Sequence, residues 1–260
     1  MTRLIYKPQR NHCTKHLNST KPNCISIIIP VYNEQNRISK TLTTLTDYLS
    51  KQEYVWEIVI VNDGSQDDTL KEVELFSKDS RIRLIDLPHS GKGAAIKEGM
   101  LSAYGEIRIM CDADMAMPER HISDFIYEIK HKNHDVVIGS RQIYGSKRFN
   151  ESNFRHLIGR IYNCWIKFFL IADYLDTQCG FKAFTEDSAN QIFPLQQLKG
   201  FGFDVEILVI ANLKELKTKE LPIEWYHNEE SKVNPVMDSI RMFLDTIKIK
   251  IAIYKGKYNH

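Results

Sequence analysis

The alternation of short strand patterns with helical patterns constrains the fold of this chain more than any other feature. Between residues 25 and 140, five runs rich in β-branched residues alternate with four segments of helical period. Strands are expected at 25–29, 57–61, 82–85, 107–111 and 135–138, and helices at 38–49, 68–77, 94–103 and 122–131. This alternation is typical of βαβ units, so we expect an α/β fold with a mostly parallel, Rossmann-like sheet flanked by helices.

The alternation stops after residue 141. Residues 153–172 predict a long, mostly apolar helix with scattered cations, residues 218–222 a strand, and residues 235–254 an amphipathic helix. No internal repeat or low-complexity linker divides the chain. We therefore expect one domain over residues 24–260, with a C-terminal amphipathic helical elaboration.

Composition indicates a folded protein without a nucleic-acid partner. Hydrophobic residues make up 43% and charged residues 26% of the 260, which excludes disorder across the whole chain. The net charge of +2 gives no reason to expect nucleic acid as a partner. The residues before Cys24 include five basic and no acidic side chains, which predicts a basic, flexible arm at residues 1–23.

Cysteine usage and hydropathy indicate where the protein works. The five cysteines are an odd number without a CxxC pair, so we expect neither a zinc site nor a disulfide framework. The sequence contains no long apolar run and no secretory signal. We expect a cytoplasmic protein that at most lies peripherally on the cytosolic face of a membrane.

Polar residues come directly after four of the five predicted strands. The four clusters are residues 30–34 (PVYNE), 62–65 (NDGS), 112–114 (DAD) and 139–141 (GSR). Ligands of open parallel sheets bind where the carboxyl ends of the strands meet. The four clusters together therefore predict a single site at that edge of the sheet.

Asp112 and Asp114 are the strongest candidates for a metal site. Residues at i and i+2 of an extended segment point to the same side, and carboxylate oxygens suit Mg²⁺ or Mn²⁺. Such a cation keeps several waters and bridges to ligand phosphates. An isolated DxD is usually a solvated turn, but this one directly follows a buried strand and accompanies the other clusters.

Two further segments point to a nucleotide. Asp63 follows a strand, where a carboxylate can accept the N3–H of a uracil, whereas the adjacent Ser65 and Asp68 have a simpler explanation as a capping box. Residues 90–95 (SGKGAA) open a helix, and helix N-terminal amides together with Lys92 suit a diphosphate. The segment is not a Walker A loop, because the first glycine of that motif is absent.

The ordered motifs resemble those of family 2 glycosyltransferases with a GT-A fold. The resemblance is carried by IIIPVYNE (27–34), VIVNDGS (59–65), GKGAA (91–95), DAD (112–114) and VIGSR (137–141). In the second half, DTQCGFK (176–182), FDVE (203–206), residues 222–225 and residues 231–232 resemble the dolichyl-phosphate β-glucosyltransferase branch, to which dolichyl-phosphate mannose synthase is related. The resemblance covers roughly residues 25–250.

The resemblance implies roles for individual residues. It places the nucleotide against Pro30, Tyr32, Glu34, Asp63, Lys92 and Asp112, and Mg²⁺ or Mn²⁺ against Asp112 and Asp114. It places the acceptor phosphate against Ser140, Arg141, Arg155 and Lys232. It implies that Asp114, Arg141 and Gln178 are catalytic, with Gln178 in the sugar pocket. Residues 24–141 would then bind the nucleotide sugar, and residues 142–260 would face the acceptor and the membrane.

The reaction implied is inverting, metal-dependent transfer of a hexose to a polyprenyl or dolichyl phosphate, with UDP-glucose as the favoured donor. A lipid monophosphate is largely dianionic at neutral pH and needs no general base. A sugar hydroxyl acceptor would need one, with Asp176 or Asp204 as candidates. A loop turn for Asp176 and a helix cap for Asp204 explain these two residues equally well.

The sequence departs from the family at two points. Eukaryotic members of the branch carry an N-terminal membrane helix, where this chain has the basic arm. Mannose synthases commonly place a glutamine metal ligand two residues after the second aspartate, where this chain has Ala116. The second departure favours the glucosyl branch.

Residues 141–182 suggest contact with a membrane surface. They carry seven basic and three acidic residues, interleaved with Phe154, Ile161, Trp165, Phe168 and Phe169. A basic amphipathic helix is typical of a lipid interface. The alternative is packing of the apolar side chains within the protein.

Other functions stay open. The same family includes polyprenyl-phosphate mannose synthases and transferases with saccharide acceptors. A sugar-nucleotide pyrophosphorylase-like nucleotidyltransferase would need a GxGTR segment after the first strand, where PVYNE stands. A non-catalytic binding module would not need charged residues at all four strand ends.

Overall fold

The computed structural model describes residues 3–4, 24–150, 153–171, 173–227 and 235–259, without the side chains of 3–4, 153–158, 161 and 235–239. The strands are β1 (Arg3–Leu4), β2 (Cys24–Val31), β3 (Val55–Asp63), β4 (Ile82–Leu87), β5 (Ile107–Met110), β6 (Val136–Ser140), β7 (Lys147–Phe149), β8 (Lys182–Thr185), β9 (Thr218–Pro222) and β10 (Glu224–Tyr226). The helices are α1 (Ile38–Leu49), α2 (Thr69–Glu74), α3 (Lys92–Ser102), α4 (His121–Lys132), α5 (Asn153–Phe169), α6 (Glu186–Ile192), α7 (Phe203–Leu213) and α8 (Pro235–Tyr254).

One eight-stranded sheet in the order β1-β4-β3-β2-β5-β8-β6-β9 forms the centre of the protein. The pairings β4-β3, β3-β2, β2-β5 and β6-β9 are parallel. Strand β8 is antiparallel to both β5 and β6, and β1 is antiparallel to β4. Strands β7 and β10 form a separate parallel pair. The expected mostly parallel α/β sheet is confirmed.

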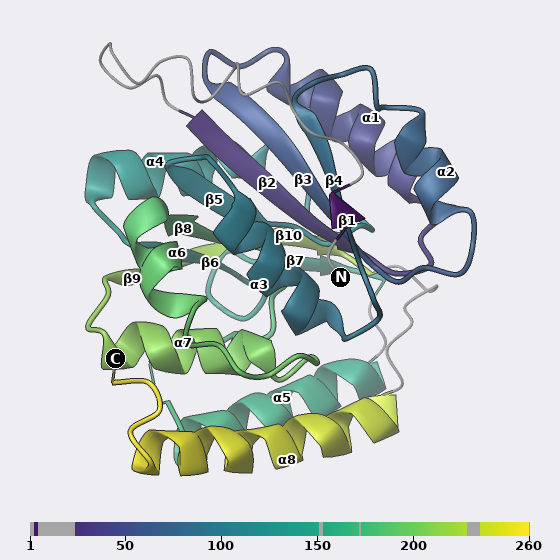
Figure 1. Cartoon of the computed structure of the whole chain (residues 1–260). Coiled ribbons are helices and arrows are strands. Elements are labelled where there is room, and N and C mark those ends of the chain that lie inside the picture. Colours follow the sequence, from purple (N-terminus) through teal and green to yellow (C-terminus); the bar gives the residue numbers. More distant parts are fainter. Residues whose placement is uncertain (1–2, 5–23, 151–152, 172, 228–234, 260) are drawn as a thin grey trace.

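Hydrophobic clusters cover both faces of the sheet, as alternation along the strands requires. Ile25, Ile27 and Ile29 of β2 pack with α1 and α4 on one face. Ile28 of the same strand packs with α3, α6 and α7 on the other face. Figure 1 shows α3, α6 and α7 in front of the sheet and α1 and α2 at its upper right.

Five elements of the second half were not predicted: β7, β8, α6, α7 and β10. Strand β8 and helices α6 and α7 lie within residues 182–213, where the sequence lacks a clear period. Residues 203–211 of α7 are all buried, so a helix enclosed on every side leaves no amphipathic pattern to detect. The insertion of β8 brings the 176–182 loop against the end of β5.

Helices α5 and α8 lie side by side as the outermost layer, beyond α7 (Figure 1). Trp165 of α5 stacks near Phe243 of α8, with ring centres 4.5 Å apart, and its indole N–H donates to Thr246 Oγ1 at 3.1 Å. The sequence left two roles open for the apolar residues of this segment, contact with lipid or packing within the protein. For Trp165, the structure shows packing within the protein. No helix in the described part of the chain is both long and apolar enough to span a bilayer.

The N-terminal region differs from expectation at two points. Within the predicted basic arm, Arg3 and Leu4 pair with Asp86 and Ile85 of β4, and the other arm residues lie outside the described residues. Cys24 is disulfide-bonded, whereas Cys111, Cys164 and Cys179 are free thiols. The sequence does not predict this disulfide, because spacing alone does not reveal which cysteines a fold brings together.

Candidate functional site

Hydrogen bonds join the end of β2 to the loop between β3 and α2. Asn33 N donates to Ser65 Oγ at 2.9 Å, and Gln66 N donates to Asn33 Oδ1 at 2.7 Å. Ser65 therefore braces the neighbouring loop rather than capping α2, whose N-cap residue Asp68 makes no side-chain capping bond. The capping-box interpretation is wrong, and the prediction that the strand-end clusters meet is supported.

Asp63 organises the loop that leads into α3. Its carboxylate accepts hydrogen bonds from Ser90 N at 2.7 Å and Gly91 N at 2.9 Å, and His89 Nδ1 lies 2.9 Å from it. The His89 ring also stacks on Tyr32, with centroids 4.3 Å apart. A carboxylate can accept further hydrogen bonds beyond those from these donors, so the contacts are compatible with a nucleoside bound at Asp63. That contact stays a prediction.

Lys92, the first residue of α3, lies against Asp112 at the end of β5, with Nζ 2.6 Å from Oδ1. Burial alone would lower the pKa of Lys92, but the charges of Asp112, Asp204 and Asp114 outweigh it and raise the pKa above its usual value. Lys92 therefore stays cationic. The proposed diphosphate lysine and the proposed metal ligand are neighbours, as the sequence predicts.

The pKa of Asp114 is shifted strongly within the site. Burial, followed by the negative charge of Asp112, raises its pKa to about 6. Ala116 N donates to its Oδ1 at 3.1 Å. Two neighbouring carboxylates are a donor set that a hard divalent cation satisfies, because the cation removes the repulsion between them.

The donor set also fits the coordination habit of Mg²⁺ and Mn²⁺. Among the described residues, no group of three or more His, Cys, Asp or Glu side chains surrounds a common point. Magnesium commonly binds through one or two carboxylates together with waters and substrate phosphates, rather than in an all-protein cage. The pair Asp112 and Asp114 therefore fits the number of protein ligands that such a cation needs.

Gly180 allows the 176–182 loop to approach the metal candidates. A methyl group at this position would overlap the Asp112 carboxylate. The loop that the sequence associates with the sugar pocket thus lies directly on the side chain that pairs with Lys92. Only a residue without a side chain permits that approach.

Replacing Gly180 with alanine should displace Asp112. A shift on the order of 1 Å in a catalytic group costs about 100-fold in rate, so we expect a loss of that size in kcat and weaker Mn²⁺ binding. Both are measured on the purified variant, by turnover and by manganese titration. Gly159→Ala is the matched control, because no described atom lies within 4 Å of a methyl group there. Equal Mn²⁺ affinity in the two variants would contradict the assignment.

A buried ion pair supports the site from behind. Lys182 is fully buried, and its Nζ donates to Asp204 Oδ1 and to the Cys179 carbonyl, the latter at 2.6 Å. Burial raises the pKa of Asp204 above its usual value, although Lys182 and Lys92 oppose this effect. Negative and positive side chains thus alternate in the order Asp112, Lys92, Asp204 and Lys182.

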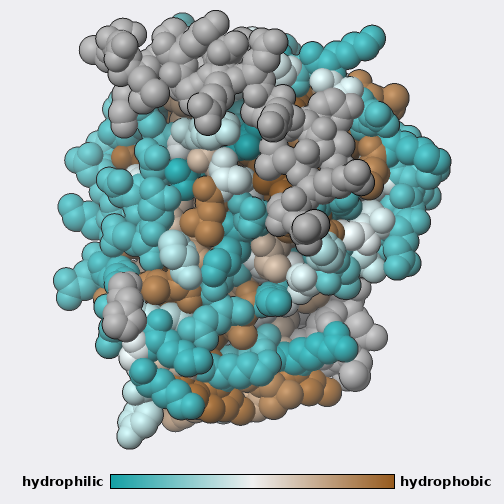
Figure 2. All heavy atoms as spheres, viewed as in Figure 1, coloured by the Kyte–Doolittle hydropathy of each residue, from teal (hydrophilic) through white to brown (hydrophobic). Residues whose placement is uncertain are grey.

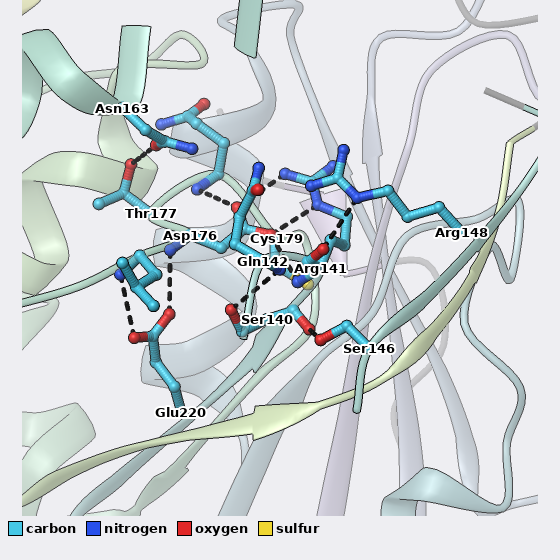
Figure 3. Close-up of polar contacts among 12 residues, drawn as sticks. Ser140, Arg141, Gln142, Ser146, Arg148, Asn163, Asp176, Thr177, Cys179 and Glu220 are labelled. Carbon is cyan, nitrogen blue, oxygen red and sulfur yellow. Dashed lines mark hydrogen bonds and ion pairs between the residues drawn. The ribbon is translucent and has the colours of Figure 1, made fainter. Parts of the chain in front are cut away.

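Arg141 and Asp176 form a second, bidentate pair (Figure 3). Arg141 Nε lies 2.7 Å from Asp176 Oδ2 and its terminal nitrogen Nη2 lies 2.8 Å from Oδ1. The guanidinium also lies over the Trp225 ring, 5.0 Å from its centroid. Burial alone would raise the pKa of Asp176, but Arg141 lowers it below its usual value.

Neighbouring residues hold this pair in place. Leu175 N and Asp176 N donate to the carboxylate of Glu220 on β9 at 3.0 and 2.9 Å. Thr177 Oγ1 donates to Asn163 Oδ1 on α5 at 3.1 Å. Figure 3 shows these contacts converging on the 176–179 segment. The loop is therefore tied to the sheet and to the outer helix layer at once.

Neither carboxylate predicted as a general base is placed to act as one. Asp176 is fully buried with both oxygens bound by Arg141. Asp204 is 3% exposed and paired with Lys182. A general base needs a free lone pair within reach of the acceptor proton. The site therefore suits an acceptor that arrives already ionised.

The remaining predicted residues differ in their placement. Pro30 lies in β2, and Glu34 pairs with Arg37 at 2.8 Å. Ser140 is fully buried, and its hydroxyl accepts from Gln142 N at 3.4 Å, which speaks against direct contact with an acceptor. Gln178 Nε2 is buried without a hydrogen-bond partner among the described residues. The Arg155 side chain and Lys232 lie outside the described residues.

Three contributors were missed by sequence reasoning. His89, Lys182 and Glu220 each acquire their role from a residue more than 20 positions away. Lys182 belongs to the 176–182 motif, but the resemblance implies no role for it. For Glu220, no local pattern could have pointed to the site.

Comparisons with known proteins agree with this geometry. Residues 26–189 match the model of the family described as "Glycosyl transferase family 2". A dolichyl-phosphate beta-glucosyltransferase of Trichomonas vaginalis is 37% identical over 87% of this chain and 73% of the relative. The enzyme of the same name from Saccharomyces cerevisiae is 34% identical over 90% of this chain and 76% of the relative.

Solved structures show the same fold. Glucosyl-3-phosphoglycerate synthase from Mycobacterium tuberculosis, in complex with Mn²⁺, UDP and phosphoglyceric acid, superimposes with a TM-score of 0.65. The two chains are 16% identical, and the match covers 87% of this chain and 78% of the other. From its family-model match, its relatives and its fold, this chain belongs to glycosyltransferase family 2 and is a glycosyltransferase.

Proposed function

We propose that this enzyme transfers glucose from UDP-glucose to dolichyl phosphate with inversion at the anomeric carbon. The observation that carries the acceptor class is the state of Asp176 and Asp204, which are buried in ion pairs and unavailable as bases. A phosphate acceptor needs no base, since its second pKa is near 6. The names of the relatives favour glucose and dolichyl phosphate.

Asp112 and Asp114 would hold Mg²⁺ or Mn²⁺. The cation, when bound, would neutralise the charge that develops on the departing nucleoside diphosphate. Lys92 would add a second positive charge beside it, because it is held within 2.6 Å of Asp112 and stays protonated. These residues thus stabilise the leaving group and leave the nucleophile to the acceptor.

Pro30, Tyr32, Glu34 and Asp63 would hold the nucleoside at the ends of β2 and β3. Gln178 would contact the donor sugar. Its side-chain amide nitrogen is buried without a partner among the described residues. An unsatisfied buried donor costs about 1–3 kcal/mol, and a sugar hydroxyl would relieve that cost. Residues 24–141 would thereby bind the donor, and residues 142–260 would face the acceptor.

Arg141 is the described cation that we assign to the acceptor phosphate, with Arg155 and Lys232 as further candidates outside the described side chains. Asp176 and the Trp225 ring fix the guanidinium before the acceptor arrives. A phosphate bound by a prepositioned guanidinium loses little side-chain entropy on binding. Ser140 remains a candidate for the acceptor site only because it precedes Arg141 in the chain, and not through its buried hydroxyl.

Arg141→Lys should affect the acceptor and spare the donor. Lysine keeps the charge but cannot form the two-point contact with Asp176 that orients the group. We expect the acceptor KM to rise by about tenfold or more, with the KM for the nucleotide sugar unchanged within about twofold. Arg160→Lys, at an exposed position on α5, is the control. A selective rise in the donor KM would contradict the assignment.

A donor competition assay tests the proposed reaction. UDP-glucose, GDP-mannose and UDP-N-acetylglucosamine are offered together with Mg²⁺ and a short polyprenyl phosphate, and each nucleoside diphosphate is quantified with its lipid product. Acceptor-dependent UDP release with a glucosyl product is the expected result. GDP release would overturn the donor assignment. Turnover only with a saccharide acceptor would overturn the acceptor assignment.

A dolichyl phosphate acceptor resides in a bilayer. We therefore place the working enzyme peripherally on a membrane, with the cytosolic face as the side where nucleotide sugars are available.

A further inference from the structure

Helix α8 presents a continuous row of large apolar side chains to solvent. The residues recur every three or four positions and therefore lie on one face of the helix. This α8 row consists of Ile240, Phe243, Leu244, Ile247, Ile251 and Tyr254, and each is at least 37% exposed. In Figure 2, hydrophobic atoms gather along the lower edge of the molecule, where Figure 1 places α8.

The α8 row is not the face that packs on the protein, apart from Phe243, which is 40% exposed and whose ring also contacts Trp165 of α5. Thr246, Ile249 and Ala252 are buried and lie on the inner side of the helix. Phe168 of α5, 88% exposed, adds a further apolar side chain to the same outer helix layer. When a helix packs on the protein with one face and exposes large apolar side chains on the other, the exposed face is typical of an interaction site.

Positive charges flank the row on both sides. Five basic residues and one acidic residue lie between positions 240 and 257, and all five basic residues are exposed. At 100° per residue, Arg241 and Lys248 fall on one flank of the row and Lys250 on the other. Lys248 Nζ lies 2.8 Å from Asp245 Oδ1, which partly offsets its charge.

We propose that the α8 row seats the protein on an anionic lipid bilayer, with the helix axis in the plane of the membrane surface. An apolar face bordered by Lys and Arg matches the chemistry of that interface, where acyl chains lie beneath negatively charged headgroups. The proposal rests on the proposed function only in that a dolichyl phosphate acceptor would lie in the same bilayer.

Contacts connect the inner side of α8 to the candidate site. A methyl group on Gly202 would meet Asp245 Oδ2 at 2.5 Å, and Gly202 precedes Asp204 by two residues. Through Trp165, α8 also contacts α5, whose Asn163 accepts a hydrogen bond from Thr177. A bilayer on the outer side of α8 would therefore lie on the same side of the 176–182 loop as helices α5 and α8.

Vesicle flotation tests the surface without any substrate. The full chain is mixed with phosphatidylcholine vesicles that contain or lack phosphatidylserine. The test variant carries Leu244→Ser, Ile247→Ser and Ile251→Ser. The matched control carries Leu75→Ser, Leu101→Ser and Leu213→Ser, three exposed leucines away from α8. We expect the wild type and the control to bind the anionic vesicles, and the test variant to bind at least about tenfold more weakly.

Two results would overturn the proposal. One is equal vesicle binding by the test variant and the control. The other is a wild-type dimer in vesicle-free solution that the test variant converts to a monomer while neither binds lipid, because the row would then seat a second copy. Charge dependence is checked by adding salt, which should weaken binding of the wild type.

A parallel activity assay separates this proposal from the proposed function. With a short acceptor phosphate dissolved without vesicles, the test variant should turn over at the wild-type rate. Vesicle binding through the row without glucosyl transfer to any phosphate acceptor would reject the proposed function and keep the surface. Transfer to the lipid acceptor with unchanged vesicle binding by the test variant would reject the surface and keep the function.

Discussion

Asp114→Asn should reduce kcat/KM for glucosyl transfer by at least about 1,000-fold. The substitution keeps the shape of the side chain and removes the charge that would hold the divalent cation. Loss of several kcal/mol of charge stabilisation at the leaving group corresponds to a rate effect of that size. Because Asp114 is a buried carboxyl whose pKa is raised to about 6, its neutral replacement should not destabilise the fold.

The comparison that makes this result specific is Asp47→Asn. Asp47 is an exposed aspartate on α1, away from the ends of the strands. Turnover and Mn²⁺ titration are measured for both variants, and thermal unfolding confirms that both are folded. Wild-type activity in Asp114→Asn, or activity that persists in the wild type after exhaustive chelation, would reject the metal site.

Lys182→Met should cost about 3–5 kcal/mol of unfolding free energy. Lys182 is fully buried, and its removal leaves Asp204 without its main counter-charge in a site that also contains Asp112. An uncompensated buried charge is strongly destabilising, in contrast to the small effect of losing an exposed one. The unfolding free energy is measured by denaturant titration.

Two further variants define the origin of that loss. Lys219→Met, at an exposed position on β9, should change the unfolding free energy by less than about 0.5 kcal/mol. Lys182→Met combined with Asp204→Asn should recover part of the loss, because the second change removes the orphaned charge. Additive losses in the double variant would show that the two side chains do not act as a pair.

The first half of the fold was predictable because its signals are local. Helix α1 was expected at 38–49 and is observed at Ile38–Leu49, since its apolar residues recur with helical period around the buried positions. Strands β2 to β6 appear as β-branched runs, although most extend beyond the predicted bounds. Helix α8 also matches its predicted limits.

Strand β8 escaped prediction for a physical reason. A lysine in a segment of four residues does not predict a buried strand. Lys182 can be fully buried only because it forms an ion pair with Asp204, which is distant in the sequence. The adjacent α7 is apolar on every side and carries no period. Both features depend on contacts between distant parts of the chain, which no local pattern records.

The candidate site was predictable to the same extent. Strand ends locate Asp63, Lys92, Asp112 and Asp114 at one edge, because parallel strands place their carboxyl ends together. The pairing of Arg141 with Asp176 and the stacking of Tyr32 on His89 join residues 35 and 57 positions apart. For Asp176 the sequence leaves a general base and a loop turn both open, and the fold instead uses this carboxylate to orient an arginine.

We expect this glycosyltransferase to join glucose to a phosphate oxygen of a lipid. Mass and NMR analysis of the product formed from UDP-glucose, Mg²⁺ and dolichyl phosphate tests this reaction most directly. The expected product is a glucosyl phosphodiester with a β-anomeric linkage, formed in step with UDP release and abolished by chelation. Free glucose with UDP release, an α-linkage, or glucose attached only to a saccharide hydroxyl would contradict it.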